Sequence, residues 1–174
     1  IRFDASLESL SGLKTLSEKG VLTAGSSSQI CDGAAAVMIV NDAGLKKLGI
    51  NPRAKIVSLA LAGDDPVIML TGPIPASKTV LDKANLSIND IDIYEVNEAF
   101  APVPLAWAHE LKANKEKLNV NGGAMALGHP LGGTGAKLMT TLLHELERRE
   151  GKYGLQAICE GGGTANAMII ERMS

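Results

Sequence analysis

Apolar residues along this chain gather in short continuous runs, separated by segments whose apolar positions recur with helical spacing. The runs predict strands over residues 33–40 (GAAAVMIV), 54–63 (AKIVSLALAG) and 90–96 (DIDIYEV). Near the C-terminus, residues 153–173 show two strand-length stretches around a triple glycine, which predicts an antiparallel hairpin. Five strands are therefore expected.

Helices are predicted between these strands. Asn41 and Asp42 offer capping oxygens for a short helix through Leu48 that stops at Gly49. A second helix is predicted over residues 76–84, beginning near Pro75.

Helical spacing returns after Glu98. Pro102 and Pro104 confine a regular helix there to the residues that follow them, unless both prolines lie in its first turn.

A long amphipathic helix is predicted from Gly135 onward. One face carries the apolar residues Leu138, Met139, Leu142, Leu143 and Leu146. The opposite, solvent-facing side is expected to carry Lys137, Thr141, His144, Glu145 and Arg148. The sum is a β-α-β-α-β-α-ββ order, which predicts an α/β fold with a mixed, largely parallel five-stranded sheet covered by helices.

Composition narrows the classes of function. The chain has 174 residues, of which 45% are hydrophobic, and its 17 basic and 19 acidic side chains are scattered, so nucleic acid is not expected as a partner. No apolar run approaches the roughly 18 residues of a membrane span, and no signal peptide opens the chain, so a cytoplasmic location is expected. The start at Ile1, without a methionine, suggests a piece of something longer.

Metal binding is not implied by the pattern of ligand-type residues. The two cysteines, Cys31 and Cys159, are far apart in the sequence, and no second pair accompanies them. His109 and His144 are predicted on solvent-facing helix positions, and neither belongs to an HExxH pair.

His129 lies in an unusual setting, the glycine-rich stretch GGAMALGHPLGGTGA. Pro130 fits the first position of a helix, so His129 is expected at the helix cap, where the positive end of the dipole disfavours imidazolium. A neutral ring that donates from Nε2 is the expectation. An ordinary turn histidine is the alternative interpretation.

Cys159 and the glycines after it form a second candidate site. The cysteine follows the strand LQAI and precedes Glu160 and three glycines, whose backbone N–H groups could form an oxyanion site. A free thiol titrates near 8.5, close enough to neutrality to serve as acid and as base. A small buried core residue remains the alternative.

Two further stretches carry candidate binding residues. Asn97 follows a predicted strand, where its amide could hold a water or a carbonyl, or could simply cap a helix. Residues 23–36 (TAGSSSQICDGAAA) offer small residues and hydroxyls that could lie along an extended ligand or form a turn. Asn97, His129 and Cys159 each follow a different predicted strand and are expected to converge on one edge of the sheet.

Three motifs in this order, NEAFA, GGAMALGHPLGGTGA and CEGGG, resemble the thiolases. The likeness runs from about Thr23 to Arg172. It implies a thiolase-like fold, with residues 1–31 as a remnant of the loop region and linker and residues 32–174 as the C-terminal domain.

The resemblance also implies a role for each catalytic residue. His129 would activate a nucleophilic cysteine and donate to the thioester oxygen, which shares a water held by Asn97. Cys159 would act as the acid or base, and Gly161 would donate its N–H to a second oxyanion hole. Coenzyme A is then a substrate, and no tightly bound cofactor or metal is implied.

Four further residues, by the same resemblance, are expected along the coenzyme A channel. They are Ala24, Ser28, Ala99 and Phe100. Acyl-CoA and CoA are therefore the expected small-molecule partners.

This chain departs from the thiolase pattern in lacking the nucleophilic cysteine, which thiolases carry in their N-terminal half. Cys31 stands where the family usually has asparagine, and by resemblance it does not take the place of the nucleophilic cysteine. The chain is thus expected to be an acyltransferase portion that is inactive alone, needs an N-terminal half, and forms a dimer or tetramer when complete. A non-catalytic CoA-binding module or partner subunit is the alternative.

Overall fold

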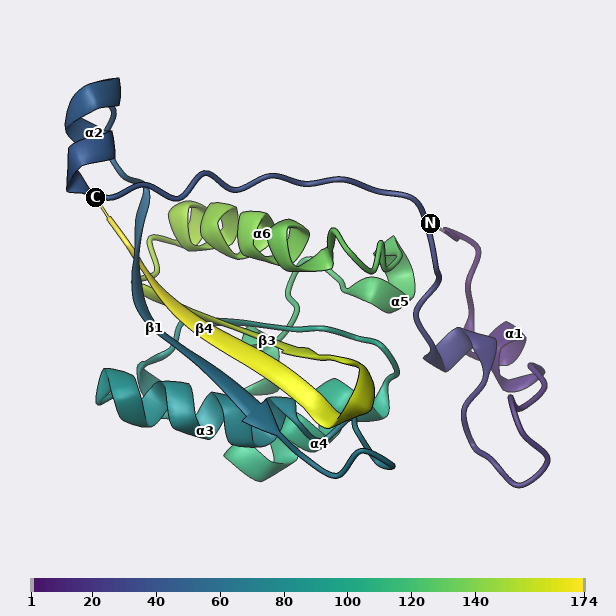
Figure 1. Ribbon diagram of the computed structural model, residues 1–174. Helices are drawn as coiled ribbons and strands as arrows, with labels where there is room; N and C mark the ends of the chain where they lie inside the picture. Colours follow the sequence, from purple (N-terminus) through teal and green to yellow (C-terminus); the bar gives the residue numbers. More distant parts are fainter. Residues whose placement is uncertain (1, 174) are drawn as a thin grey trace.

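A mixed four-stranded β-sheet forms the centre of the computed structural model, which describes residues 2–173 (Figure 1). The strand order is β1 (Ala54–Gly63), β4 (Thr164–Arg172), β3 (Tyr153–Cys159) and β2 (Ile93–Val96). β4 runs antiparallel to both of its neighbours, and β2 alone is parallel to β3. The mixed sheet and the hairpin are confirmed, but the sheet is not largely parallel and has four strands rather than five.

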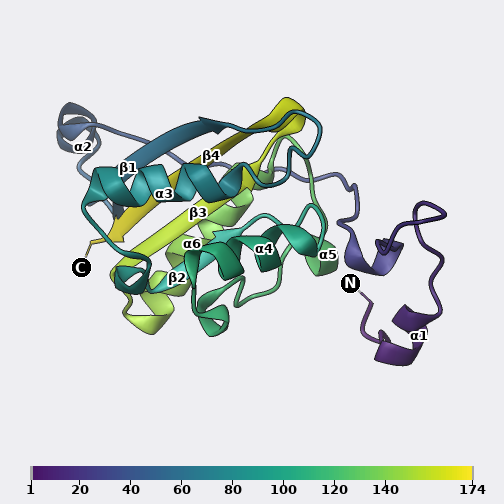
Figure 2. The same ribbon diagram turned by 90° about the horizontal axis from the view of Figure 1, so that it is seen from below.

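Helices cover both faces of the sheet (Figures 1 and 2). α3 (Pro73–Ala84) and α4 (Pro102–Leu111) pack on one face, and α6 (Thr134–Arg149) packs on the other. Three short helices, α1 (Leu7–Ser11), α2 (Asp42–Leu48) and α5 (Ala124–Leu127), complete the set. Within residues 2–173, no helix has the length and apolar character needed to cross a bilayer.

The larger hydrophobic core lies between the sheet and the pair α3 and α4. Trp107 is fully buried there, 5.3 Å from the ring of Tyr94, and its Nε1 donates to Ser77 Oγ at 2.8 Å. Pro102 and Pro104 occupy the first turn of α4, where their missing N–H groups cost no helical hydrogen bond. The second option that the sequence left open for this helix is therefore the correct one.

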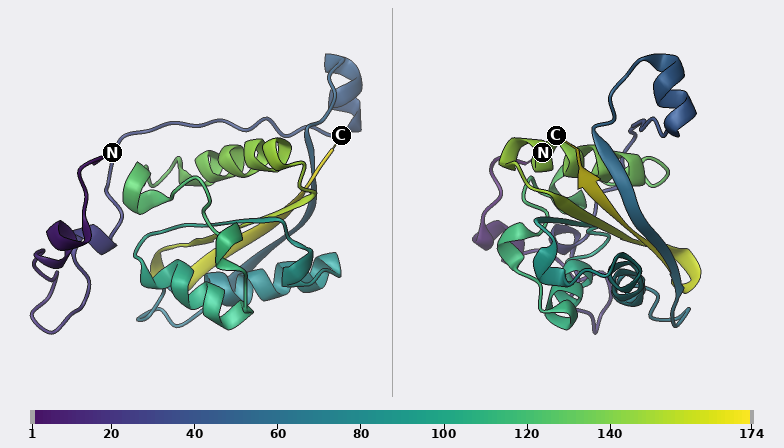
Figure 3. Two further views of the ribbon diagram at one scale, coloured as in Figure 1. Left: turned by 180° about the vertical axis from the view of Figure 1, so that it is seen from behind. Right: turned by 90° about the vertical axis from the view of Figure 1, so that its left-hand side faces the viewer.

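Residues 33–40 do not form the predicted strand. They run as an extended, almost wholly exposed segment past α6 to α2 (Figure 3), and no strand of the described chain pairs with them. An apolar run makes a strand only when a neighbour accepts its backbone hydrogen bonds. The helix that follows is as predicted: Asn41 Oδ1 accepts from Gly44 N at 2.9 Å, and Gly49 ends the helix with φ 63°.

α6 is amphipathic as predicted, but one of its expected surface residues is buried. Leu138, Leu142 and Leu146 pack against the sheet, and Glu145 is only 2% exposed. The Glu145 carboxylate accepts hydrogen bonds from Arg148, Arg149 and Asn121. These bonds, that of Arg148 first, lower the pKa of Glu145 to about 2. The prediction that Glu145 faces solvent was wrong, because ion pairs with arginine allow a charged carboxylate to be buried.

A second buried carboxyl group, on β2, has no such partners. Glu95 is fully buried, and neither of its oxygens accepts a hydrogen bond from the described residues. Gln156 stands beside it in the parallel register, and its Oε1 is also without a partner. Burial, reinforced by the charges of Glu98 and Glu145, raises the pKa of Glu95 to about 8. The sheet face under α6 therefore holds a carboxyl group that is neutral at pH 7.

The Glu95 carboxyl is expected to make the stability of the fold depend on pH. Because the pKa of Glu95 is raised in the folded state, binding of its proton stabilises that state. This contribution to stability is complete below about pH 4.5 and is lost as the pH rises through about 8. Between pH 5 and pH 8 the wild type should lose roughly 2–4 kcal/mol of unfolding free energy relative to Glu95→Gln.

Urea unfolding at several pH values measures this difference. Glu110→Gln, the same change at an exposed site on α4, is the control and should parallel the wild type. Parallel curves for Glu95→Gln and the wild type would contradict a buried neutral carboxyl group.

Candidate active site

Asn97 lies directly after β2, at the edge of the sheet where the parallel strands β2 and β3 both end. Its backbone N–H donates to Ala157 O at 3.0 Å, so the residue continues the strand pairing by one step. The side chain is buried, with Oδ1 unpartnered among the described residues and Nδ2 3.3 Å from His129 Nε2. Asn97 is not a helix cap, since Ala101 takes that position for α4.

His129 reaches Asn97 from a different direction than the sequence predicts. It follows the short helix α5 and Gly128 rather than a strand. Pro130 begins a turn closed by Gly133 N donating to its carbonyl at 2.7 Å, and α6 starts only at Thr134. The placement of His129 at the cap of α6 was therefore wrong, because the prolyl ring starts a turn four residues earlier.

The His129 ring is neutral for reasons other than the expected helix dipole. Burial lowers its pKa first, and the positive charge of Lys137 lowers it further. Lys137 Nζ donates to Gly128 O at 2.9 Å, which fixes the ammonium beside the residue preceding His129. Repulsion from this ammonium thus disfavours a second positive charge on the imidazole.

Cys159 is the last residue of β3 and is half-buried. Because β2 and β3 are parallel neighbours, Cys159 lies at the same edge of the sheet as Asn97. Burial, with a smaller effect of the Glu160 charge, raises the pKa of its thiol. The resting form is therefore a protonated thiol, which favours the acid role of the two that the sequence suggested.

The turn after Cys159 is open. Gly161 begins the 3-10 turn Gly161–Gly163, and a Cβ added to it would meet no atom within 4 Å. The structure thus leaves space for another group beside this backbone.

Three of the four residues expected along the CoA channel come together. Ser28 N donates to Ala99 O at 3.0 Å, and the segment around Ser28 forms an antiparallel bridge from Ser27 to Phe100. His129 N donates to Gln29 O at 2.7 Å, so the same segment also contacts the loop that carries His129. Ala24 lies apart, exposed in the 3-10 turn Ala24–Ser26.

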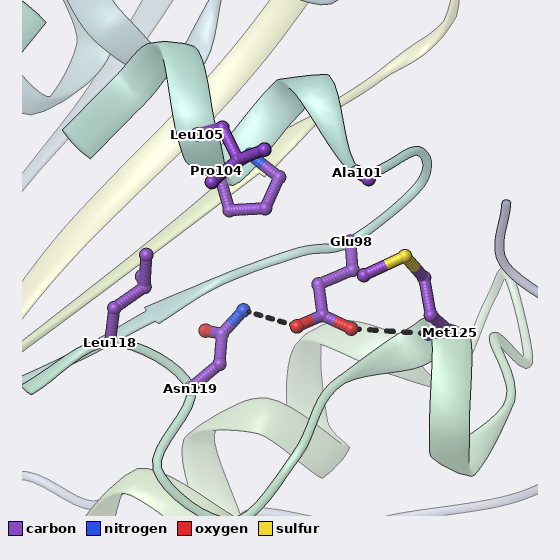
Figure 4. A pocket seen from close by; sticks show the side chains of 7 residues that line it. All are labelled: Glu98, Ala101, Pro104, Leu105, Leu118, Asn119 and Met125. Carbon is purple, nitrogen blue, oxygen red and sulfur yellow. Dashed lines mark hydrogen bonds between the residues drawn. The ribbon is translucent and has the colours of Figure 1, made fainter. Parts of the chain in front are cut away.

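Glu98 is a site residue that sequence reasoning quoted within NEAFA but gave no role. Its carboxylate accepts from Asn119 Nδ2 at 2.9 Å and from Met125 N at 3.2 Å (Figure 4). Asn119 in turn exchanges hydrogen bonds with the backbone N–H and carbonyl of Val96.

These contacts attach the loop that precedes His129 to the end of β2. They also border a cavity of about 220 Å³ on the side of α4.

Thr134 was also missed, although its spacing from the histidine in GHPLGGT was a usable signal. Its hydroxyl lies 2.6 Å from His129 Nδ1. Among residues 2–173, no three His, Cys, Asp or Glu side chains gather closely enough to hold a metal ion.

A substitution at Gly123 can test whether Glu98 attaches the loop that precedes His129 to the end of β2. Gly123 is buried, and a Cβ there would overlap the Glu98 carboxyl group. Gly123→Ala should displace that carboxylate and lower the free energy of unfolding by about 1–3 kcal/mol, because two partly buried hydrogen bonds are lost.

Chemical denaturation measures the loss. Gly132→Ala is the matched control, since a Cβ there meets nothing within 4 Å. Equal stability of the two variants would show that Glu98 does not hold the loop.

Known proteins resemble this chain over almost its whole length. Residues 50–172 match the family described as thiolase, C-terminal domain, and residues 1–43 match the thiolase N-terminal domain. A steroid 3-ketoacyl-CoA thiolase of Mycobacterium tuberculosis is 58% identical over 170 residues, covering 98% of this chain and 42% of the relative. An acetyl-CoA acetyltransferase of Cupriavidus necator is 47% identical, covering 99% of this chain and 44% of the relative.

A solved structure shows the same fold. The crystal structure of human mitochondrial 3-ketoacyl-CoA thiolase superposes with a TM-score of 0.96 at 46% identity, covering 99% of this chain and 44% of that one. The chain thus spans less than half the length of these relatives. By its sequence motifs, its fold and the match over residues 50–172, the chain belongs to the thiolase family.

Proposed function

We propose that this chain is the C-terminal catalytic portion of a thiolase, an acyltransferase that works by Claisen condensation or by thiolytic cleavage of a 3-ketoacyl-CoA. The observation that carries the proposal is the contact between Asn97 and His129 at the sheet edge where β3 delivers Cys159. Claisen chemistry needs donors for a developing enolate oxygen and an acid or base for a C–H bond. These three residues are of the right types for both tasks.

Each residue has a defined task in this proposal. Asn97, through a water, and His129 stabilise the enolate oxygen of the thioester. In thiolysis the Cys159 thiol gives its proton to the carbon of the leaving enolate, so that the S–H bond breaks and a C–H bond forms. The raised pKa of Cys159 suits this direction because it keeps the proton available. Gly161 N–H supports the second oxyanion, and the open space at this turn is compatible with that.

Coenzyme A is the proposed substrate rather than a resident cofactor. The segment around Ser28 pairs through its backbone with Ala99 and Phe100 and leads to His129, so it is a suitable wall for the channel. Support comes from a related crystal structure, that of human mitochondrial 3-ketoacyl-CoA thiolase in complex with CoA. It has a TM-score of 0.92 and 45% identity, covering 99% of this chain and 44% of that one. Ala24 would join the channel at its outer end.

A partner half is the second element of the proposal. Acyl transfer requires a nucleophile to carry the acyl group, and neither Cys159, assigned to proton transfer, nor Cys31 fills that role by resemblance. The exposed apolar side chains of Val37, Met38 and Ile39, at 45%, 67% and 71%, are the kind of surface that a neighbouring sheet covers. We place the nucleophile on an N-terminal half, in a cytoplasmic protein that is oligomeric when complete.

Activity should depend on that half. The chain alone is expected to show no thiolysis of acetoacetyl-CoA, measured by loss of substrate absorbance. Addition of the N-terminal part of the Mycobacterium tuberculosis relative should restore turnover. Cys159→Ala and His129→Ala should then each reduce kcat by about 100-fold or more.

His144→Ala, at an exposed site on α6, is the control and should leave turnover unchanged. Clear turnover by the isolated chain would contradict the need for a second half. Calorimetric binding of CoA without turnover after reconstitution would instead favour a binding module.

Residues 33–40 should report the docking of the second half directly. In the isolated chain their amides are expected to exchange with solvent rapidly, because no strand accepts their hydrogen bonds. On reconstitution, hydrogen–deuterium exchange should slow by at least about tenfold in this segment. Unchanged exchange in an active complex would show that the segment is not a docking strand.

A further inference from the structure

The His129 ring has a hydrogen-bond neighbour at each nitrogen. Nδ1 lies 2.6 Å from Thr134 Oγ1, and Nε2 lies 3.3 Å from Asn97 Nδ2. Thr134 is 3% exposed and begins α6, so its hydroxyl is held by a regular helix and shielded from water. The proton on the imidazole is therefore governed by these two side chains.

The hydroxyl of Thr134 has one proton and two neighbours. Besides Nδ1, Thr134 Oγ1 lies 3.0 Å from Pro130 O, which can only accept. When the hydroxyl donates to this carbonyl, it can only accept from the ring, so Nδ1 carries the proton. The Asn97 NH₂ group is a donor and requires a lone pair on Nε2. Both neighbours thus favour the same tautomer, protonated at Nδ1 and basic at Nε2.

We propose that Thr134 is a positioning residue that accepts the Nδ1 proton of His129 and so leaves Nε2 as the basic nitrogen of the site. The catalytic role given to Thr134 rests on the proposed function, whereas the hydrogen bonds that set the tautomer of His129 do not. It differs from the expectation of a resting ring that donates from Nε2. Lys137, beside Gly128, keeps the resting ring neutral without touching either nitrogen's hydrogen bond.

The assignment gives one nitrogen both tasks that His129 has in a thiolase. With a lone pair on Nε2, the ring takes the proton of the nucleophilic thiol: the S–H bond breaks, its electron pair stays on sulfur, and an Nε2–H bond forms. The resulting imidazolium then donates from Nε2 to the thioester oxygen. Throughout, Nδ1–H remains bonded to Thr134, so the ring does not turn between the two steps.

NMR of the ¹⁵N-labelled chain tests this at pH 8, by resolving protonated from unprotonated ring nitrogens. The chain has three histidines, and His109→Gln and His144→Gln assign them. His144 is an internal reference, since its Nδ1 lies 2.8 Å from Thr140 O and must be protonated there. Wild-type His129 should show a protonated Nδ1 and a bare Nε2.

The variants separate positioning from mere packing. Thr134→Val, nearly the same shape without the hydroxyl, should move His129 toward the Nε2–H tautomer, and Thr134→Ser should keep the wild-type signature. In the reconstituted enzyme, Thr134→Val should lower kcat about 10-fold or more with little change in KM, and Thr134→Ser should stay near the wild type.

A wild-type ring protonated at Nε2 would overturn the proposal, and this readout stands even if Thr134→Val does not fold. A folded Thr134→Val chain with an unchanged tautomer would overturn it as well. The spectrum does not depend on turnover. An inactive reconstituted protein would therefore contradict the proposed function and leave the tautomer assignment intact.

Discussion

The attachment of the loop over residues 119–128 to the end of β2 is the constraint on which the site depends. Asn119 completes the hydrogen bonding of Val96 along the edge of β2 that no other strand of residues 2–173 covers, and Glu98 holds the loop by two more bonds. The loop then delivers His129 onto the residue that follows the same strand. Two candidate catalytic side chains, separated by 32 positions in the sequence, are thereby fixed to one strand end.

The two faces of the sheet differ in character. The face toward α3 and α4 is an apolar core that includes Trp107. The face toward α6 carries Glu95, Gln156 and, one step beyond the strand, Asn97. Polar groups are therefore buried on the side where Asn97 contacts His129, whereas Cys159 packs against the core on the other face. A small apolar cluster that includes Leu142 and Leu146 anchors the far end of α6.

The sequence predicted correctly those elements whose structure depends mainly on neighbouring residues. The strand over residues 54–63 is observed residue for residue, and the cap at Asn41 and the stop at Gly49 are where the sequence indicates. Errors occur where a distant partner decides. Residues 33–40 lack a strand to pair with, Glu145 is buried by ion pairs, and His129 is placed by a loop attachment that periodicity does not register. The motifs identified Asn97, His129 and Cys159 as candidates, but the contacts of Thr134 and Glu98 needed coordinates.

The segment over residues 33–40 has a consequence for how such a chain behaves in the absence of the proposed N-terminal half. It is a run of eight apolar residues without charge or proline, extended and open to solvent on its backbone. Such a segment can pair with an identical copy as readily as with a foreign sheet edge. Docking and self-aggregation therefore compete for the same hydrogen bonds. At high chain concentration the competition favours aggregates, so assembly with the proposed N-terminal half would depend on timing as well as on affinity.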